Sequence, residues 1–335
     1  MAQAVPFQKS YNDSVQKAKK KIIETQQRRF PMIFPVSALK FLTTQEVTAM
    51  KLTEIINSDK LSLSFEVFPP KTDDAFESVK YATEQIAELS PSYMSVTYGA
   101  GGGTSDYTVK IAENLKNKGV TPLAHLSCVS SSKDEIHKKL AELKQHGIEN
   151  ILALRGDIPE DKALLKTDYR YASELTQDIR DFGGFCIGGA CYPEAHPESA
   201  SSFEDIENLR RKVDAGCEFL TTQMFFDNNI YYNFVYRLRN SGIDVPVVAG
   251  IMPVTNPKSI KRICRISGSA LPQRFVRIVD RFGDDPMAMT QAGIAYATEQ
   301  IIDLFANGVR AVHIYSMNKP EVARKIKENI SGIIK

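Results

Sequence analysis

The chain has 335 residues, with 42 Lys and Arg residues against 40 Asp and Glu residues, so its formal net charge is only +2. This balance excludes the strong positive field that nucleic acids or anionic membranes require of a partner. The N-terminus is polar and lysine-rich, and no segment approaches the roughly 18 to 20 apolar residues of a membrane span. We therefore expect a cytoplasmic protein with no nucleic-acid and no membrane partner.

The five cysteines are expected to be buried thiols of a reducing compartment. They form no Cys-x-x-Cys pair and no Cys/His cluster with zinc spacing. The sequence therefore predicts no metal and no iron–sulfur site.

The first 60 residues differ from the rest and are predicted to form a helical extension. Residues 11–29 are charged and weakly amphipathic, and Thr43 with Glu46 forms a capping box for a second helix through Ile56. Between them, residues 30–35 are apolar without a period. We expect this segment to pack against the floor of the following domain or against a neighbouring subunit, and the extension to close that floor or to dock a partner.

From residue 61 to residue 335, apolar runs alternate with polar segments of helical pattern. The runs begin near Leu61, Tyr93, Thr121, Ile151, Phe185, Phe219, Val245 and Ala311. Spacings of about thirty residues match βα units, and eight such units make a closed parallel barrel. The predicted fold is therefore α/β, a (β/α)₈ TIM barrel over residues 61–335 behind the extension of residues 1–60. The long last interval is expected to hold helices over 258–266 and 285–307.

The first predicted strand ends in a carboxylate. Its apolar residues alternate with Ser62, Ser64 and Glu66, and two prolines stop the strand directly after the acid. Glu66 is therefore expected at the rim of the barrel, where burial raises the pKa of a carboxyl group and suits a general acid. The alternative is a strand-end glutamate that simply reaches solvent.

Polar residues follow the other predicted strands, at the end where barrel enzymes carry their chemistry. They are the segments 95–105, 154–157 and 192–196, with His125 and Gln223. The glycine run 99–103 is not a dinucleotide fingerprint, because Thr104 takes the place of the third glycine and no acid ends the next strand. We expect either a loop whose backbone approaches a ligand or a tight turn.

A set of polar residues repeats with helical spacing after the fifth strand. Asp205, Asn208, Arg211 and Lys212 share an arc of about 120° on one helix. Two cations with an amide and an acid suit a diphosphate and a ribityl chain. The alternative is a solvated helix face with an Asp205–Asn208 pair. His196 likewise has two interpretations, a contact with a ligand or a structural role.

Six motifs together resemble the signature of the methylenetetrahydrofolate reductase family. They are the segments 65–72, 95–102, 154–157, 192–198, 211–216 and 222–227, and the resemblance runs from about Leu61 to the C-terminus. It implies an FAD-containing barrel that reduces 5,10-methylenetetrahydrofolate to 5-methyltetrahydrofolate, by ping-pong hydride transfer from NADH or NADPH through the flavin. The small-molecule folate is then the substrate.

The resemblance also implies roles for single residues. Glu66 matches a general acid that assists opening of the folate's imidazolidine ring, and Asp157 matches an acid near flavin and folate. Matching FAD contacts are Thr97, His125, Arg155, Gly156, Asp157, Tyr171, Ala172, Tyr192, His196, Asp205, Asn208, Arg211 and Lys212. Matching folate contacts are Gln223, Tyr315 and Lys319, where the family often has Arg in place of Lys319.

One departure from the family pattern leaves the electron donor open. Residues 254–274 contain no aromatic residue, whereas bacterial members carry a phenylalanine that stacks on the nicotinamide or folate, at the place of Ile263. A protein partner is then a second candidate donor beside NAD(P)H, with residues 1–60 as its docking element. The sequence also leaves open a proline dehydrogenase-like FAD enzyme, a non-catalytic subunit of an electron-transfer complex, and a homo-oligomer.

Overall fold

A computed structural model of the chain describes residues 50–335 except residues 71, 99–104, 159–164, 167 and 335. Residues 49–335 form one compact unit, to which the following description is confined. The expectations for residues 11–29, for residues 30–35, for the capping box at Thr43 and for the glycine run 99–103 therefore lie outside the described residues.

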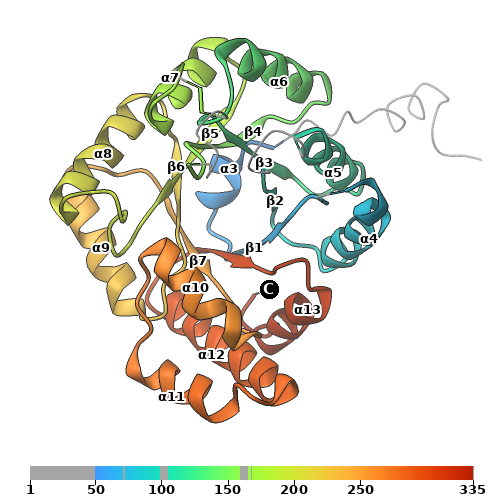
Figure 1. Cartoon of the computed structure of the whole chain (residues 1–335), viewed down its shortest axis with the longest axis vertical. Coiled ribbons are helices and arrows are strands. Elements are labelled where there is room, and N and C mark those ends of the chain that lie inside the picture. Colours follow the sequence, from blue (N-terminus) through green and yellow to red (C-terminus); the bar gives the residue numbers. More distant parts are fainter. Residues whose placement is uncertain (1–49, 71, 99–104, 159–164, 167, 335) are drawn as a thin grey trace, which may run out of the picture. The chain divides into compact units, whose positions relative to one another are not determined.

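Among the described residues, eight parallel strands close into a barrel in which each strand pairs with the next and β8 pairs with β1 (Figure 1). The strands are β1 Ser62–Val67, β2 Met94–Val96, β3 Pro122–Ser127, β4 Asn150–Leu154, β5 Cys186–Cys191, β6 Phe219–Thr222, β7 Val247–Ile251 and β8 Ala311–Tyr315. Each begins within two residues of the predicted position, which confirms the (β/α)₈ barrel.

Helices cover the outside of the barrel and bury one apolar stripe each against it. They are α4 Phe76–Ala87, which follows the 3₁₀ turn η2 Asp73–Ala75, then α5 Ser105–Asn117, α6 Lys133–Gln145, α7 Ala172–Phe182, α8 Ser202–Asp214, α9 Asn228–Asn240, α12 Pro286–Ala306 and α13 Pro320–Asn329. None of the helices in the described part of the chain is long and apolar enough to cross a membrane.

Two further helices, α10 Pro257–Ser267 and α11 Gln273–Phe282, lie between β7 and α12. The first matches the predicted helix over 258–266, and α12 matches the one over 285–307. Helix α11 was not predicted from the sequence. Asn256 and Asp285 set the starts of α10 and α12, because their side chains accept hydrogen bonds from the backbone N–H groups of Lys258 and Met287.

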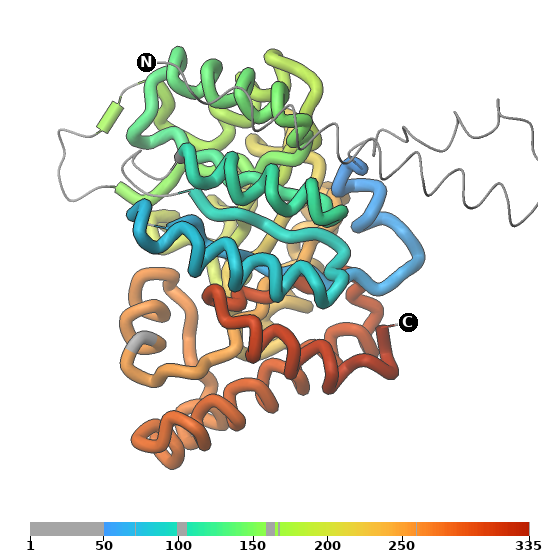
Figure 2. The backbone as a smooth tube through the Cα atoms, turned by 90° about the vertical axis from the view of Figure 1, so that its right-hand side faces the viewer, coloured from blue at the N-terminus to red at the C-terminus, as the bar shows by residue number. Residues whose placement is uncertain are grey.

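A short helix, α3 Leu52–Ile56, packs against one end of the barrel. Leu52 and Ile56 are buried among side chains near the starts of the strands, including Tyr93 and Phe219, and the Leu52 N–H donates to Asn150 Oδ1 at 2.8 Å. Figure 2 shows α3 on one side of the barrel and α10 on the other. The segment 52–56 thus belongs to the barrel unit, although it falls within the predicted extension.

Candidate active site

The strand ends opposite α3 surround a cavity of about 880 Å³. Residues from every strand or from the loop that follows it line this cavity, and the predicted site residues among them are Glu66, Thr97, His125, Arg155, Asp157, Tyr192, His196, Gln223 and Tyr315. The C-terminal face of the barrel therefore brings together most of the residues predicted for the site.

A second cavity of about 310 Å³ adjoins the first between α7 and α8. The predicted site residues that line it are Arg155, Tyr171, Ala172, Tyr192, His196, Asp205, Asn208, Arg211 and Lys212. Arg155, Tyr192 and His196 line both cavities, so the two spaces are contiguous. Gly156 and Lys319 line neither.

Glu66 lies deeper than the rim position that the sequence suggested. Only 7% of its surface is exposed, because its backbone still pairs with Ser95 of β2 and Tyr315 of β8. Burial raises the pKa of Glu66 from 4.5 to about 8. Its carboxyl group therefore keeps a proton near pH 7 while it faces the larger cavity.

His125 is a titratable neighbour of Glu66. Its Nε2 atom lies 3.7 Å from Glu66 Oε2 and has no hydrogen-bond partner among the described residues. Burial lowers the pKa of His125 to about 3, so the imidazole is neutral near pH 7. Because Glu66 is neutral as well, the contact is not an ion pair, and the free nitrogen is available to a polar ligand in the cavity.

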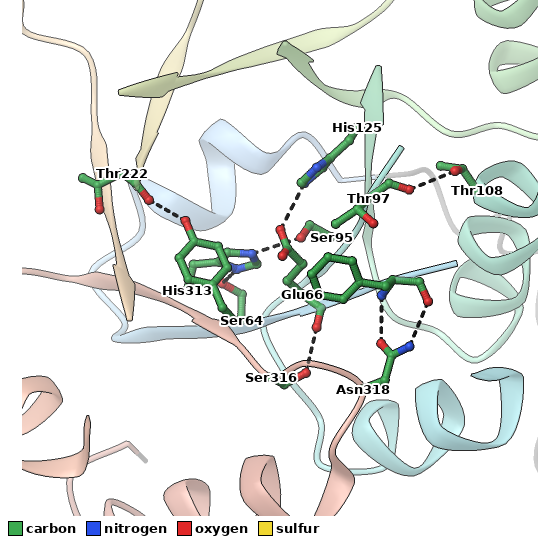
Figure 3. Close-up of polar contacts among 12 residues, drawn as sticks. Ser64, Glu66, Ser95, Thr97, Thr108, His125, Thr222, His313, Ser316 and Asn318 are labelled. Carbon is green, nitrogen blue, oxygen red and sulfur yellow. Dashed lines mark hydrogen bonds and ion pairs between the residues drawn. The ribbon is translucent and has the colours of Figure 1, made fainter. Parts of the chain in front are cut away.

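His313 is a site residue that was not predicted from the sequence. Its Nδ1 lies 2.8 Å from Ser64 Oγ and its Nε2 lies 3.0 Å from Ser95 Oγ (Figure 3). Ser64 donates its own proton to the carbonyl of Val312, so we assign the proton of the ring to Nδ1 and let Nε2 accept from Ser95. The sequence feature that could have pointed to His313 is its place as a lone histidine in the apolar strand β8, two residues before Tyr315.

A turn after β8 is fastened to the end of β1, beside the acid. Ser316 Oγ donates to the carbonyl of Glu66 at 2.7 Å (Figure 3). The Asn318 amide bonds both backbone groups of Phe68, accepting from its N–H at 2.8 Å and donating to its carbonyl at 2.9 Å. Met317 and Asn318 adopt φ values of 54° and 55°, a region that non-glycine residues seldom occupy. The two bonds of Asn318 offset this strain.

Tyr315 crosses the end of the barrel to reach β6. Its hydroxyl donates to the carbonyl of Thr222, and its ring lies over Gly250 of β7. Next in the chain, Gln223 donates its N–H to the carbonyl of Cys191 at 2.7 Å, and its side-chain Oε1 accepts from the N–H of Met224 at 3.0 Å. The end of β6 is therefore held by a backbone bond from β5 and by a hydroxyl group from β8, and the Gln223 side chain is held by the backbone of the next residue.

Gly250 makes this arrangement possible, so we expect Gly250→Ala to destabilise the protein. An added Cβ would lie 2.5 Å from Tyr315 Oη and closer still to the carbonyl of Thr222. Overpacking of this kind costs roughly 1 to 3 kcal/mol of the free energy of unfolding, which urea denaturation measures. The control is Gly332→Ala, where nothing lies within 4 Å of the new Cβ. Equal stabilities of the two variants would contradict the tight packing at Gly250.

The turn after β4 is held by an ion pair and a glycine. Arg155 donates two hydrogen bonds to the Glu198 carboxylate, at 2.6 and 2.8 Å, and this pairing raises the pKa of Arg155. Gly156 has φ +88°, and a Cβ there would meet Ser127 Cβ at 3.0 Å. The turn leaves Asp157 exposed at the wall of the larger cavity. Glu198 is a further site residue without a predicted role.

Lys212 reaches the second cavity across β5. Its Nζ donates to the carbonyl of Ala190 at 2.5 Å, and its stem passes over Gly189, where a Cβ would lie 2.6 Å from Lys212 Cδ. Burial lowers the pKa of this ammonium group. On the same helix face, Arg211 is exposed and donates to Asn208 Oδ1 at 3.1 Å, while Asp205 accepts from Ser199 at 3.0 Å.

Lys319 lies apart from the other predicted substrate residues. Its Nζ donates to Thr255 Oγ1 at 2.7 Å, in the loop between β7 and α10. The five cysteines are buried free thiols, and the described residues contain no group of three His, Cys, Asp or Glu side chains that could hold a metal ion.

The raised pKa of Glu66 makes stability depend on pH. The stabilisation by the buried, protonated acid is complete below pH 4.5 and is lost as the pH rises to about 8, because only the unfolded chain ionises in this window. Relative to Glu66→Gln, the free energy of unfolding of the cofactor-free protein should fall by up to ~1.4 kcal/mol per pH unit. Urea denaturation of both proteins between pH 5 and 8 measures this. A constant difference would contradict the raised pKa.

Comparison with known protein families gives evidence that is independent of the geometry of the site. The model of the family described as methylenetetrahydrofolate reductase matches residues 51–331. The chain is 34% identical over 268 residues to 5,10-methylenetetrahydrofolate reductase of Pectobacterium carotovorum subsp. carotovorum. The aligned region covers 80% of this chain and 89% of that protein. The chain is also 34% identical to the Escherichia coli (strain K12) protein of the same name, over 80% of this chain and 90% of that protein.

Two further similarities support less about this chain, one because it covers half of the relative and the other because the sequence identity is low. The chain is 35% identical over 301 residues to methylenetetrahydrofolate reductase (NADH) 1 of Zea mays, but spans only 50% of that protein and 85% of its own length. A solved structure from Clostridium thermocellum, described as binding two copies of 5-methyl-5,6,7,8-tetrahydrofolic acid, aligns with a TM-score of 0.58 at 15% identity, over 85% of this chain and 100% of that one. At this identity the likeness shows a shared fold alone.

Proposed function

The chain belongs to the methylenetetrahydrofolate reductase family, a family of oxidoreductases, and from this premise we propose that it reduces 5,10-methylenetetrahydrofolate to 5-methyltetrahydrofolate through a bound FAD, by a ping-pong mechanism. The observation that carries the proposal is the buried carboxyl group of Glu66 in the wall of a cavity of about 880 Å³, where burial raises its pKa to about 8 and so favours the protonated form. A neutral acid in such a place is suited to donate a proton at neutral pH.

The residues around the two joined cavities fit an FAD. Lys212 and Arg211 supply positive charge for a diphosphate, and Asp205 and Asn208 supply acceptors and an amide for hydroxyl groups. The unpartnered Nε2 of His125 offers a polar contact in the larger cavity. When bound there, the flavin supplies a carrier that accepts and delivers hydride.

On the substrate side, we assign the proton transfer to Glu66. Protonation of the departing nitrogen of the imidazolidine ring favours opening of the ring and leaves an iminium cation at N5. The charge of Asp157, at the wall of the same cavity, stabilises this cation. Gln223 and Tyr315 line the cavity and would orient the pterin. Lys319 would contact the substrate only after it exchanges its bond to Thr255.

We propose NADH or NADPH as the electron donor, with a protein partner as the second candidate. The observation that favours the second candidate is that Ile263 lines the cavity where the family carries a stacking aromatic side chain. Loss of such stacking weakens nicotinamide binding by roughly 0.5 to 1.5 kcal/mol, or several-fold.

One anaerobic experiment tests the function and the donor together. The purified protein is mixed with NADH, NADPH or reduced ferredoxin while the flavin absorbance is followed, and methylenetetrahydrofolate is then added. We expect a flavin that bleaches with one donor and is reoxidised by the folate, with formation of 5-methyltetrahydrofolate. A flavin that proline reduces and the folate leaves reduced would favour a proline dehydrogenase, and a flavin that no donor reduces would favour a binding subunit.

A further inference from the structure

The chain just before and at the start of helix α7 forms part of the wall of the second cavity. Tyr171 and Ala172 line this cavity, to which we assign the diphosphate of FAD, and 50% of the surface of Tyr171 is exposed. The guanidinium carbon of Arg170 lies 5.2 Å from the centroid of the Tyr171 ring. Because burial does not hold this ring, its position depends on how the backbone beside it is fastened.

The segment before α7 is fastened to two neighbouring helices, α6 and α7 (Figure 1). On the side of α6, the Asp168 carboxylate accepts a hydrogen bond from the N–H of Lys133 at 2.8 Å. On the side of α7, the Glu174 carboxylate accepts from the N–H groups of Arg170 and Tyr171, the latter at 3.2 Å. These bonds hold the backbone on both sides of Tyr169.

Tyr169 itself is tied to a buried carboxylate on α7. The ring of Tyr169 is buried, and its hydroxyl donates to Asp178 Oδ2. The same carboxylate lies 2.9 Å from His137 Nε2, to which we assign a proton, and 3.4 Å from Lys133 Nζ, both on α6. Burial opposes the charge of Asp178, but the bonds from Tyr169 and His137 outweigh it, and the pKa of Asp178 is lowered. We call Tyr169, Asp178, His137 and Lys133 the α7 clasp.

The α7 clasp lies behind the cavity wall and not in it. Among the described lining residues of the two cavities, none belongs to the clasp. Tyr169 lies two residues before Tyr171, and Asp178 lies in the second turn of the helix that begins at Ala172. A buried ionic cluster is weak evidence for a role in stability, because apolar residues of similar volume often stabilise a fold equally well. The clasp joins the two pieces of chain that meet at the cavity.

We propose that Tyr169 and Asp178 are positioning residues for FAD, which act through the backbone to keep Tyr171 and Ala172 in place in the wall of the second cavity. This inference rests on the proposed function. With the clasp closed, the wall is already ordered in the cofactor-free protein, so FAD does not have to order it on binding. Without the clasp, FAD binding weakens although no atom that lines the cavity has been removed.

The test is Tyr169→Phe, which keeps the ring and removes only the hydroxyl group. A wall that is in place for a third to a tenth of the time raises the dissociation constant of FAD roughly 3-fold to 10-fold, which is the effect that we expect. Dilution of the holoprotein, followed by the recovery of flavin fluorescence, measures it. Asp178→Asn should act in the same direction, and the two effects should not add, because both substitutions weaken one bond.

A further variant shows whether the effect passes through the cavity wall. In a Tyr171→Ala background, Tyr169→Phe should change FAD affinity less than it does in the wild type, because the side chain that it positions is gone. A clasp that only joined α6 to α7 would behave differently. Its loss would lower the stability of the cofactor-free protein, measured by urea denaturation, and would leave the dissociation constant of FAD unchanged.

The matched control is Tyr232→Phe. It removes a hydroxyl group that donates to Asp303 Oδ2 at 2.7 Å, in a second Tyr–Asp pair that lies between α9 and α12 and lines neither cavity. The control should keep the wild-type affinity for FAD. Unchanged affinity in Tyr169→Phe, or additive effects of Tyr169→Phe and Tyr171→Ala, would overturn the inference. A wild-type protein that binds no FAD would contradict the proposed function instead.

Discussion

Glu66→Gln is expected to lower the rate of folate reduction by at least ~10²-fold, while reduction of the flavin by its donor stays nearly normal. The substitution keeps the size of the side chain and its capacity for hydrogen bonds, but removes the acidic proton that the buried carboxyl group retains near pH 7. Stopped-flow measurement of each half-reaction separates the two steps. In the wild type, the folate half-reaction should also slow above pH 8, as the acid form is lost.

The pH profile of the variant provides the control. Glu66→Gln should show no loss of rate around pH 8, because the titrating group is gone. An equal loss in both half-reactions would instead mean that Glu66 supports the fold or the placement of the flavin. If the variant still lost rate around pH 8 as the wild type does, the titration would belong to another group.

Lys212→Met should weaken FAD binding by roughly 10-fold to 150-fold, the equivalent of about 1.5 to 3 kcal/mol for a charge-assisted hydrogen bond. Methionine keeps an apolar stem of similar length over Gly189, so the packing at β5 is largely preserved while the charge is removed. Dilution of the holoprotein, followed by the recovery of flavin fluorescence, measures the dissociation constant.

Arg211→Ala is the matched comparison on the same helix face. Because Arg211 is exposed whereas the Lys212 ammonium is shielded from solvent, its loss should weaken FAD binding less. Unchanged affinity in Lys212→Met would refute the assignment of the second cavity to the diphosphate. A larger effect in Arg211→Ala would place the diphosphate further out on α8.

The order of elements was predictable because parallel strands buried on both faces leave continuous apolar runs. The run from Phe219 and the run from Ala311 both start β-strands at the predicted residue. Helical spacing also predicted the shared face of α8, and all four of its polar residues line the second cavity. These features depend on short stretches of chain, which the sequence displays directly.

The remaining features depend on contacts between distant segments. The depth of Glu66 follows from pairing with Ser95 and Tyr315, and the bond of Lys319 follows from its nearness to Thr255 in another loop. His313 binds Ser64 across 249 positions of the chain, and neither residue signals the other in the sequence. Helix α11 was not predicted because Gly268 and Pro272, which precede it, are turn signals that favour a loop.

The fastening of residues 316–318 to the end of β1 has a consequence for protein synthesis. The strand that carries Glu66 emerges early from the ribosome, but its hydrogen-bonded neighbour β8 and the amide of Asn318 come about 250 residues later. Until then, one edge of β1 has no partner strand, and exposed edges invite pairing with other chains. Newly made chains therefore pass most of their synthesis with one edge of the strand that carries Glu66 unpaired.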